Sequence, residues 1–227
     1  METKRFVIFT GLWPAGNFPK LSREDFIACA DAGYLVCKSA GAKPDIVIGD
    51  FDSLPEALSD EIEGLGIERI IHPHEKDDTD TMLCAKYGIA LGFEKFLIVG
   101  GIGGDFRHTI ANVQTLSFLM DMDCSAELIS GMEKLFMADG ETLTLFRDPK
   151  PAVPVEFTGA PGTKFSVFSF SERSSGVYVQ NSKYELSDAV LTQSYPVGVS
   201  NEFIGTEPVT VSVSHGRLLI ITEYNQA

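Results

Sequence analysis

Two aspartates separated by one phenylalanine stand directly after a short apolar run, in the stretch DIVIGDFDS. In an extended segment, Asp50 and Asp52 would share one face, where their charges repel unless a cation lies between them. Carboxylate oxygens are the ligands that Mg²⁺ and Mn²⁺ prefer. The pair therefore indicates either a site for a hard divalent cation or a solvated turn.

Other polar clusters also follow apolar runs. Asp31 comes directly after FIACA, and Asp80 closes KDDTD, where it begins a predicted helix whose dipole favours a carboxylate. A plain helix cap is the alternative role for Asp80. The glycine run of residues 100–104 lies between a predicted strand and a predicted helix, so its backbone N–H groups are expected to cradle phosphate. It is not a Walker A motif, because no Gly-Lys-Ser/Thr follows.

The remaining polar candidates are single side chains. His72 and His74, in HPH, are too few for a zinc site, and we expect a solvated loop there. His108 is a stronger candidate because it follows the glycine run beside Arg107. Trp13, the only tryptophan, is expected to pack within its loop, with stacking on a nucleotide base as the alternative.

The elements that must position these residues alternate between strand and helix. Continuous apolar runs predict strands over 5–10, 26–30, 46–48, 69–71, 96–99 and 126–129. Helices are predicted over 34–42, 54–65, 81–91 and 109–122. A capping-box pattern at Ser22 and Asp25 makes a helix the alternative for 26–30. This order is typical of a three-layer α/β domain with a parallel sheet, and each polar cluster follows the carboxyl end of a strand, the edge where such sheets bind ligands.

The pattern changes after about Met137. GETLTLF, KFSVFSF, GVYVQ, EPVTVSV and GRLLIIT are short alternating or β-branched runs, separated by Gly, Pro and Ser clusters. They predict an antiparallel β-sandwich, jelly-roll-like, without helices. We therefore expect two domains, residues 1–137 and 138–227.

Composition limits the possible partners. The 227 residues include 32 Asp and Glu against 18 Lys and Arg, a formal net charge of −14, which argues against a nucleic-acid surface. No apolar run reaches the roughly 18 residues that span a membrane, so no membrane partner is expected. METKRFVIFTG is read as a first strand rather than a signal peptide, because its apolar run is short. The four cysteines form no C-x-x-C pair, which favours buried free thiols and a reducing cytoplasm.

Four stretches together resemble the thiamine pyrophosphokinase family, in that family's order. They are ADAGYLVCKSAGAKPDIVIGDFDS, EKDDTDTMLCA, GGIGGDFRHTIANV, and GVSNEF with GRLLII. The resemblance implies transfer of the diphosphoryl group of ATP to the hydroxyl of thiamine, with release of AMP and a requirement for Mg²⁺. It also implies an α/β domain followed by a β-sandwich domain, and a homodimer whose thiamine site lies at the subunit interface.

Matching positions imply the site residues. The catalytic acidic set around Mg²⁺ and the diphosphate would be Asp31, Asp50, Asp52 and Asp80, with Asp50, Asp52 and Asp80 as metal ligands. The substrate-binding residues would be Lys76, Asp77, Thr79, Gly103, Gly104, Arg107, His108, Asn112, Ser200 and Asn201, of which Ser200 and Asn201 would contact thiamine.

The sequence departs from the family's motifs in two places. Asp31-Ala32-Gly33 replaces D-G-G, a mild change if Ala32 suits the local backbone. The family's G-R-x-D-H is replaced by GDFRH, in which Asp105 and Arg107 have exchanged positions. We expect the exchange to preserve an ion pair but to change which group faces the phosphates.

Two other functions compete with this interpretation. A phosphatase with a D-x-D nucleophile would have Thr or Val two residues after the second aspartate, where this chain has Leu54, and its motif normally follows the first strand. A non-catalytic protein that binds thiamine or a nucleotide is the second alternative, suggested by the exchange of Asp105 and Arg107.

Overall fold

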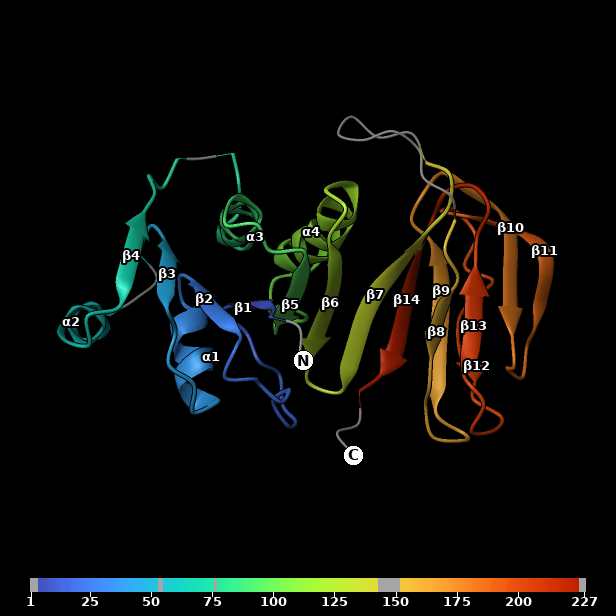
Figure 1. Cartoon of the computed structure of the whole chain (residues 1–227), viewed down its shortest axis with the longest axis horizontal. Helices are drawn as coiled ribbons and strands as arrows, with labels where there is room; N and C mark the ends of the chain where they lie inside the picture. The colour runs from blue at the N-terminus through green and yellow to red at the C-terminus, as the bar shows by residue number, and fades with distance from the viewer. Residues whose placement is uncertain (1–3, 53–54, 76, 143–151, 225–227) are drawn as a thin grey trace. The chain divides into compact units, whose positions relative to one another are not determined.

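The computed structural model describes residues 4–52, 55–75, 77–142 and 152–224, which fold into two compact units (Figure 1). The first unit comprises Met1–Leu119 with Asp123–Met132, and the second comprises Met120–Met122 with Glu133–Asn225.

The first unit is built on parallel strands that pair in the order β6-β5-β1-β2-β3-β4. The strands are β1 (Phe6–Phe9), β2 (Phe26–Ala30), β3 (Ile46–Gly49), β4 (Glu68–Ile71), β5 (Lys95–Val99) and β6 (Ser125–Ser130). The helices are α1 (Gly33–Ser39), α2 (Glu56–Gly64), α3 (Asp80–Ala90) and α4 (Phe106–Asp121). Every residue of β1 and β3 is buried, as continuous apolar strands require when helices cover both faces of a sheet. The predicted α/β class is confirmed, and 26–30 is a strand.

Parallel pairing brings the carboxyl ends of these strands to one edge. Phe9, the last residue of β1, pairs with Val99, the last residue of β5. Ala30, at the end of β2, pairs with Ile48 in β3. The prediction that the polar clusters follow strands that end at one shared edge is therefore confirmed.

The second unit is an antiparallel β-sandwich, as predicted. Its strands are β7 (Glu133–Asp139), β8 (Val155–Phe157), β9 (Lys164–Ser169), β10 (Arg173–Gln180), β11 (Leu186–Thr192), β12 (Asn201–Glu202), β13 (Val209–Ser212) and β14 (Arg217–Glu223). They pair in the orders β12-β9-β14-β7 and β11-β10-β13-β8. Apolar side chains of both layers, such as Phe165 and Leu218 from one and Val179 and Val211 from the other, form a common core.

Several strands of this unit differ from the prediction. Residues 133–137, which the sequence assigned to the first domain, belong to β7, because the whole of Glu133–Asp139 pairs with β14. The strands β8, β11 and β12 were also not predicted. Most of the predicted strand GETLTLF lies outside the described residues, and only an isolated bridge at Glu141 falls within them.

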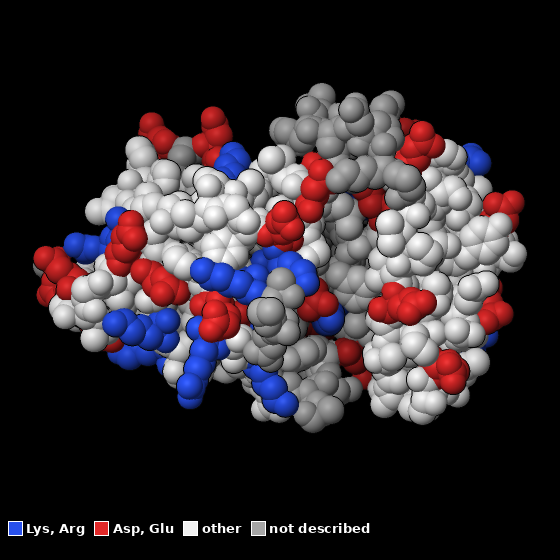
Figure 2. Space-filling view, viewed as in Figure 1, with Lys and Arg blue, Asp and Glu red and all other residues white. Residues whose placement is uncertain are grey.

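Charged side chains of both signs mix on the one face of the molecule that the space-filling view shows. On the face drawn in Figure 2, Lys and Arg lie among Asp and Glu rather than in a continuous stripe. In the part of the chain that the structure describes, none of the helices has the length and apolarity to cross a membrane. Cys29, Cys37, Cys84 and Cys124 are all buried free thiols, as predicted.

Candidate active site

A cavity of about 440 Å³ opens at the carboxyl edge of the parallel strands, lined by the loops after β1, β2, β4 and β5 and by the start of α4. Seven of the predicted site residues line it: Asp31, Thr79, Asp80, Gly103, Gly104, His108 and Asn112. Among the described residues of the first unit, Asp50, Asp52, Asp77 and Arg107 were predicted for the site but do not line this cavity. The edge therefore gathers residues from four separate loops into one concave site.

Asp31 is held in place by unusually close backbone packing. Its φ of 44° is in the left-handed region, and a Cβ at Gly49 would lie 2.8 Å from the Asp31 Cβ. Gly33 is equally constrained, since its Cβ would meet the Phe9 carbonyl oxygen. Ala32 has an ordinary helical φ of −57°, so the departure from the family's D-G-G is accommodated without strain.

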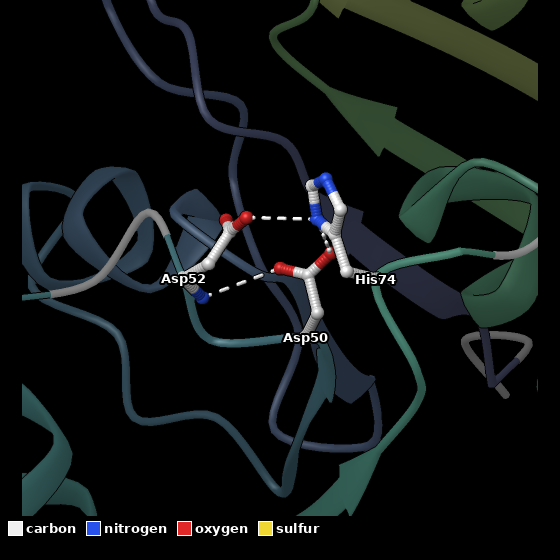
Figure 3. Close-up of side chains that lie close together, drawn as sticks. All are labelled: Asp50, Asp52 and His74. Atoms are coloured by element: carbon white, nitrogen blue, oxygen red, sulfur yellow. Dashed lines mark hydrogen bonds and ion pairs between the residues drawn. The ribbon is translucent and has the colours of Figure 1, made fainter.

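Asp50 and Asp52 form a cluster with His74 (Figure 3). The His74 Nδ1 lies 3.1 Å from the Asp50 Oδ2 and 2.9 Å from the Asp52 Oδ2. The sequence interpretation considered residues 50–52 as an extended segment. They are not extended, because Phe51 has a φ of 63°. The Asp52 backbone N–H instead donates to the Asp50 Oδ1 at 3.2 Å. A tight turn, rather than alternation along a strand, brings the two carboxylates together.

His74 is a site residue that was not predicted from the sequence. Its side chain is 77% exposed, which agrees with the expected solvated loop, yet its ring points between the two carboxylates (Figure 3). The His72 backbone N–H donates to the Gly49 carbonyl at 2.9 Å and ties this loop to the end of β3. The available signal was that HPH follows β4, which pairs with β3, the strand that Asp50 follows.

The cluster suits a divalent cation. One ligand atom from each of Asp50, Asp52 and His74 lies within 4.8 Å of the others, and two of the three are the hard carboxylate oxygens that Mg²⁺ prefers. These residues therefore fit the metal that the resemblance implies. Asp80 lines the cavity but does not belong to this group, so its role as a metal ligand stays a prediction.

The segment before α3 differs in detail from its predicted roles. Thr79, rather than Asp80, caps the helix: its Oγ1 accepts the Met82 backbone N–H at 3.2 Å. Asp78, not predicted, lines the cavity and accepts a hydrogen bond from Lys86 at 2.6 Å. Asp77 is exposed. Lys76 lies outside the described residues.

The glycine loop uses its backbone donors internally. The N–H groups of residues 100, 101, 102 and 103 donate to the Ile129 carbonyl, the Leu12 carbonyl, the Ser130 Oγ and the Thr109 Oγ1. Asn112 donates to the Gly101 carbonyl at 2.9 Å, and a Cβ at Gly101 would collide with the Asn112 amide. Close packing explains Gly100 and Gly101, and residues 100–103 do not provide the predicted cradle of free N–H groups.

The exchanged residues Asp105 and Arg107 form the expected ion pair. The Arg107 Nε lies 3.0 Å from each Asp105 oxygen, and the Arg107 backbone N–H donates to the Asp105 Oδ1 at 2.9 Å. Asp105 thus caps α4, which starts at Phe106 instead of the predicted 109. The side-chain hydrogen bond from Arg107 lowers the pKa of Asp105 from 3.8 to about 2. The Arg107 side chain is 90% exposed, so it is the carboxylate of the pair that lines the cavity.

Trp13 packs within its own loop. Its ring stacks on Phe18 with 4.4 Å between centroids, and its Nε1 donates to the Gly16 carbonyl at 3.3 Å. The expectation of loop packing is therefore confirmed.

Ser200 and Asn201 lie in the second unit. Asn201 is buried, and its amide bonds the Tyr184 backbone N–H and carbonyl, the Ser182 Oγ and the Glu202 N–H. These bonds engage both ends of its side chain in holding the local backbone. Ser200 is exposed with a left-handed φ of 61°, so it is the more accessible of the two residues.

Comparison with known families gives matches in both units. The catalytic domain model of thiamin pyrophosphokinase matches residues 19–128, and the vitamin B1 binding domain model of the same family matches residues 153–218. A thiamine pyrophosphokinase of Bacillus subtilis is 25% identical over 191 residues, covering 84% of each chain. Thiamine pyrophosphokinase 1 of Oryza sativa is 29% identical over 100 residues, a stretch that covers 38% of this chain and 38% of the rice protein.

Solved structures share the fold. The Bacillus subtilis thiamine pyrophosphokinase structure superposes with a TM-score of 0.81 at 21% identity, covering 99% of this chain and 100% of that one. Thiamin pyrophosphokinase from Candida albicans gives a TM-score of 0.77 at 14% identity, with coverage of 99% and 90%. At these identities the likeness concerns the fold alone, whereas the two family models match the sequence of each unit in order. The chain therefore belongs to the thiamin pyrophosphokinase family.

Proposed function

We propose that this chain transfers the diphosphoryl group of ATP to the hydroxyl of thiamine, producing thiamine diphosphate and AMP. The observation that carries the proposal is the cavity at the strand edge, lined by Asp31, Asp80 and the glycine loop. It lies in a chain that matches the family's catalytic domain and its vitamin B1 binding domain.

The acidic residues of this edge would divide the work. Asp50 and Asp52, with His74 between them, would hold Mg²⁺. When bound, Mg²⁺ would neutralise phosphate oxygens of ATP and align them for in-line attack. Asp31 and Asp80 line the cavity, where their negative charge favours the cationic thiazolium ring and a carboxylate can accept the proton of the attacking hydroxyl.

The substrate-binding residues act through position and shape. His108 lines the cavity and provides a donor for phosphate oxygens, while Asn112 fixes the glycine loop through its bond to Gly101. Lys76, Asp77 and Thr79 frame the nucleotide phosphates, as the resemblance implies. Arg107 acts indirectly, by holding Asp105 at the start of α4. Gly103 and Gly104 allow close approach of the nucleotide.

The remaining parts of the proposal concern assembly and location. The first domain carries the nucleotide and Mg²⁺, and the β-sandwich domain contributes thiamine contacts and the dimer surface. Ser200 contacts thiamine at the subunit interface of a homodimer, and Asn201 supports it by holding the local backbone. Exposed apolar side chains of this unit, such as Tyr195 and Ile204, support a dimer surface. Buried free thiols support a reducing cytoplasmic location.

The test measures AMP formation by the purified chain, incubated with ATP and Mg²⁺ in the presence and absence of thiamine. Chromatography separates and quantifies the products. We expect AMP and thiamine diphosphate to form in equal amounts, and only when thiamine is present. Release of ADP or inorganic phosphate without thiamine would instead indicate the phosphatase alternative. Binding of thiamine and ATP without AMP would indicate the non-catalytic alternative.

A further inference from the structure

His74 is the one member of the cation cluster that is not a carboxylate. Its Nδ1 faces the Asp50 and Asp52 oxygens at 3.1 and 2.9 Å, while the rest of the ring is 77% exposed. The same residue lines the cavity, so the cluster adjoins the space proposed for the substrates.

The spacing of these atoms fits a shared metal ion. In an octahedral site with metal–oxygen distances of about 2.0–2.1 Å, neighbouring ligand atoms lie roughly 3 Å apart. The two separations from the His74 Nδ1 have this length. The ring nitrogen that faces the carboxylates can therefore occupy one corner of a coordination sphere whose adjacent corners are the two carboxylate oxygens.

A nitrogen ligand changes which metal the site prefers. Mg²⁺ takes oxygen ligands and keeps several waters, so an imidazole adds little to its binding. Imidazole suits first-row transition metals, whose affinity for mixed N and O sites rises from Mn²⁺ through Co²⁺. A site with two carboxylates and one imidazole should therefore favour the transition ions over Mg²⁺.

We propose that His74 is a third metal ligand, through Nδ1, and that it makes the Asp50–Asp52 site select a first-row transition dication over Mg²⁺. The inference rests on the proposed function only in taking this cluster as the metal site of the enzyme.

The backbone supports this role. The hydrogen bond from the His72 N–H to the Gly49 carbonyl, at 2.9 Å, ties the loop that carries His74 to the end of β3, directly before Asp50. His72 lies two residues from His74 in the same loop, but it does not belong to the cluster, so it provides a matched control.

The test uses the full chain, without a histidine tag and without ATP or thiamine. Isothermal titration measures the affinities of Co²⁺ and Mg²⁺ for the wild type, His74→Ala and His72→Ala, and the visible absorption of bound Co²⁺ reports a nitrogen ligand. We expect the wild type to bind Co²⁺ more tightly than Mg²⁺. His74→Ala should weaken Co²⁺ binding about tenfold or more and leave Mg²⁺ binding within about twofold. His72→Ala should change neither affinity.

Three results would overturn the inference: a wild type without preference for Co²⁺, an unchanged Co²⁺ affinity in His74→Ala, or an equal loss of both metals in that variant. The last result would mean that His74 only positions the carboxylates. Thermal unfolding of each variant identifies any loss of folding, and if His74→Ala does not fold, the visible absorption of Co²⁺ bound to the wild type still shows whether a nitrogen ligand is present. The metal titration contains no substrate, so its result does not depend on catalysis. Failure of AMP formation would therefore contradict the proposed function and leave this inference intact.

Discussion

Two clusters in this chain each combine two aspartates with one basic side chain, and they differ in the exposure of the base. In the first unit, the His74 side chain is 77% exposed between Asp50 and Asp52. In the second unit, the Arg217 side chain is 5% exposed, with its Nη2 2.7 Å from the Asp121 Oδ1 and 3.2 Å from the Asp139 Oδ2.

The difference separates a binding site from a structural site. Burial opposes the charged form of Arg217, but hydrogen bonds to Asp139 and Asp121 outweigh it and raise the pKa of Arg217. This guanidinium is thus a permanent countercharge. A histidine carries a full charge only when it is protonated, and the aspartates beside an exposed histidine can also bind an external cation. The first cluster can therefore bind a cation from solution, whereas the second neutralises its carboxylates internally.

The largest effect is expected where the buried cluster is broken. Arg217→Met should lower the free energy of unfolding by about 3–5 kcal/mol, because it leaves two carboxylates in a buried site without their countercharge. Urea denaturation measures the loss. Lys183→Met is the control, since Lys183 pairs with Glu202 on the exposed surface at 2.9 Å, where solvent screens the pair, and its loss should lower the free energy of unfolding far less. Equal losses in the two variants would contradict the contrast between the clusters.

The exposed cluster should respond in the opposite way. Asp50→Asn should lower the rate of AMP formation about a hundredfold or more, since loss of a metal ligand removes several kcal/mol of transition-state stabilisation. Its stability without metal should be unchanged or higher, because one of two crowded negative charges is gone. Steady-state kinetics and thermal unfolding check both parts. Near-normal turnover, or a stability loss as large as that of Arg217→Met, would refute the assignment.

A smaller effect is expected from the packing that holds Asp31. Gly49→Ala places a methyl group 2.8 Å from the Asp31 Cβ, and relief of this contact should cost about 1–3 kcal/mol of stability and reduce turnover. Gly64→Ala is the matched control, because a Cβ there meets nothing within 4 Å, and it should be neutral or stabilising by up to about 1 kcal/mol. Denaturant unfolding and the AMP assay would show whether the two variants differ as expected.

The smallest effect concerns the exposed pair of Asp105 and Arg107. Because the pKa of Asp105 falls from 3.8 to about 2 on folding, its contribution to stability is present above pH 3.8 and is lost as the pH falls through about 2. Asp105→Asn keeps a good helix cap and removes only the charge. The variant should melt slightly below the wild type at pH 7 and equally with it near pH 2. A difference that persists at low pH would show that the charge is not its cause.

The sequence by itself determined the two fold classes and the edge on which the site is built. Continuous apolar runs separated by polar loops are local patterns, and parallel pairing then brings the residues after each strand to one edge. The positions of Asp31, Asp80, His108 and Asn112 at one cavity followed from this rule.

Only the tertiary structure decided how the side chains at that edge are used. His74 meets Asp50 from 24 residues away, and Arg217 reaches Asp139 and Asp121 from 78 and 96 residues away. No local pattern encodes such distances, because they depend on which strands become neighbours. Likewise, the sequence left the N–H groups of residues 100–103 and the amide of Asn201 available to bind ligands. In the folded chain these groups form hydrogen bonds with other parts of the protein.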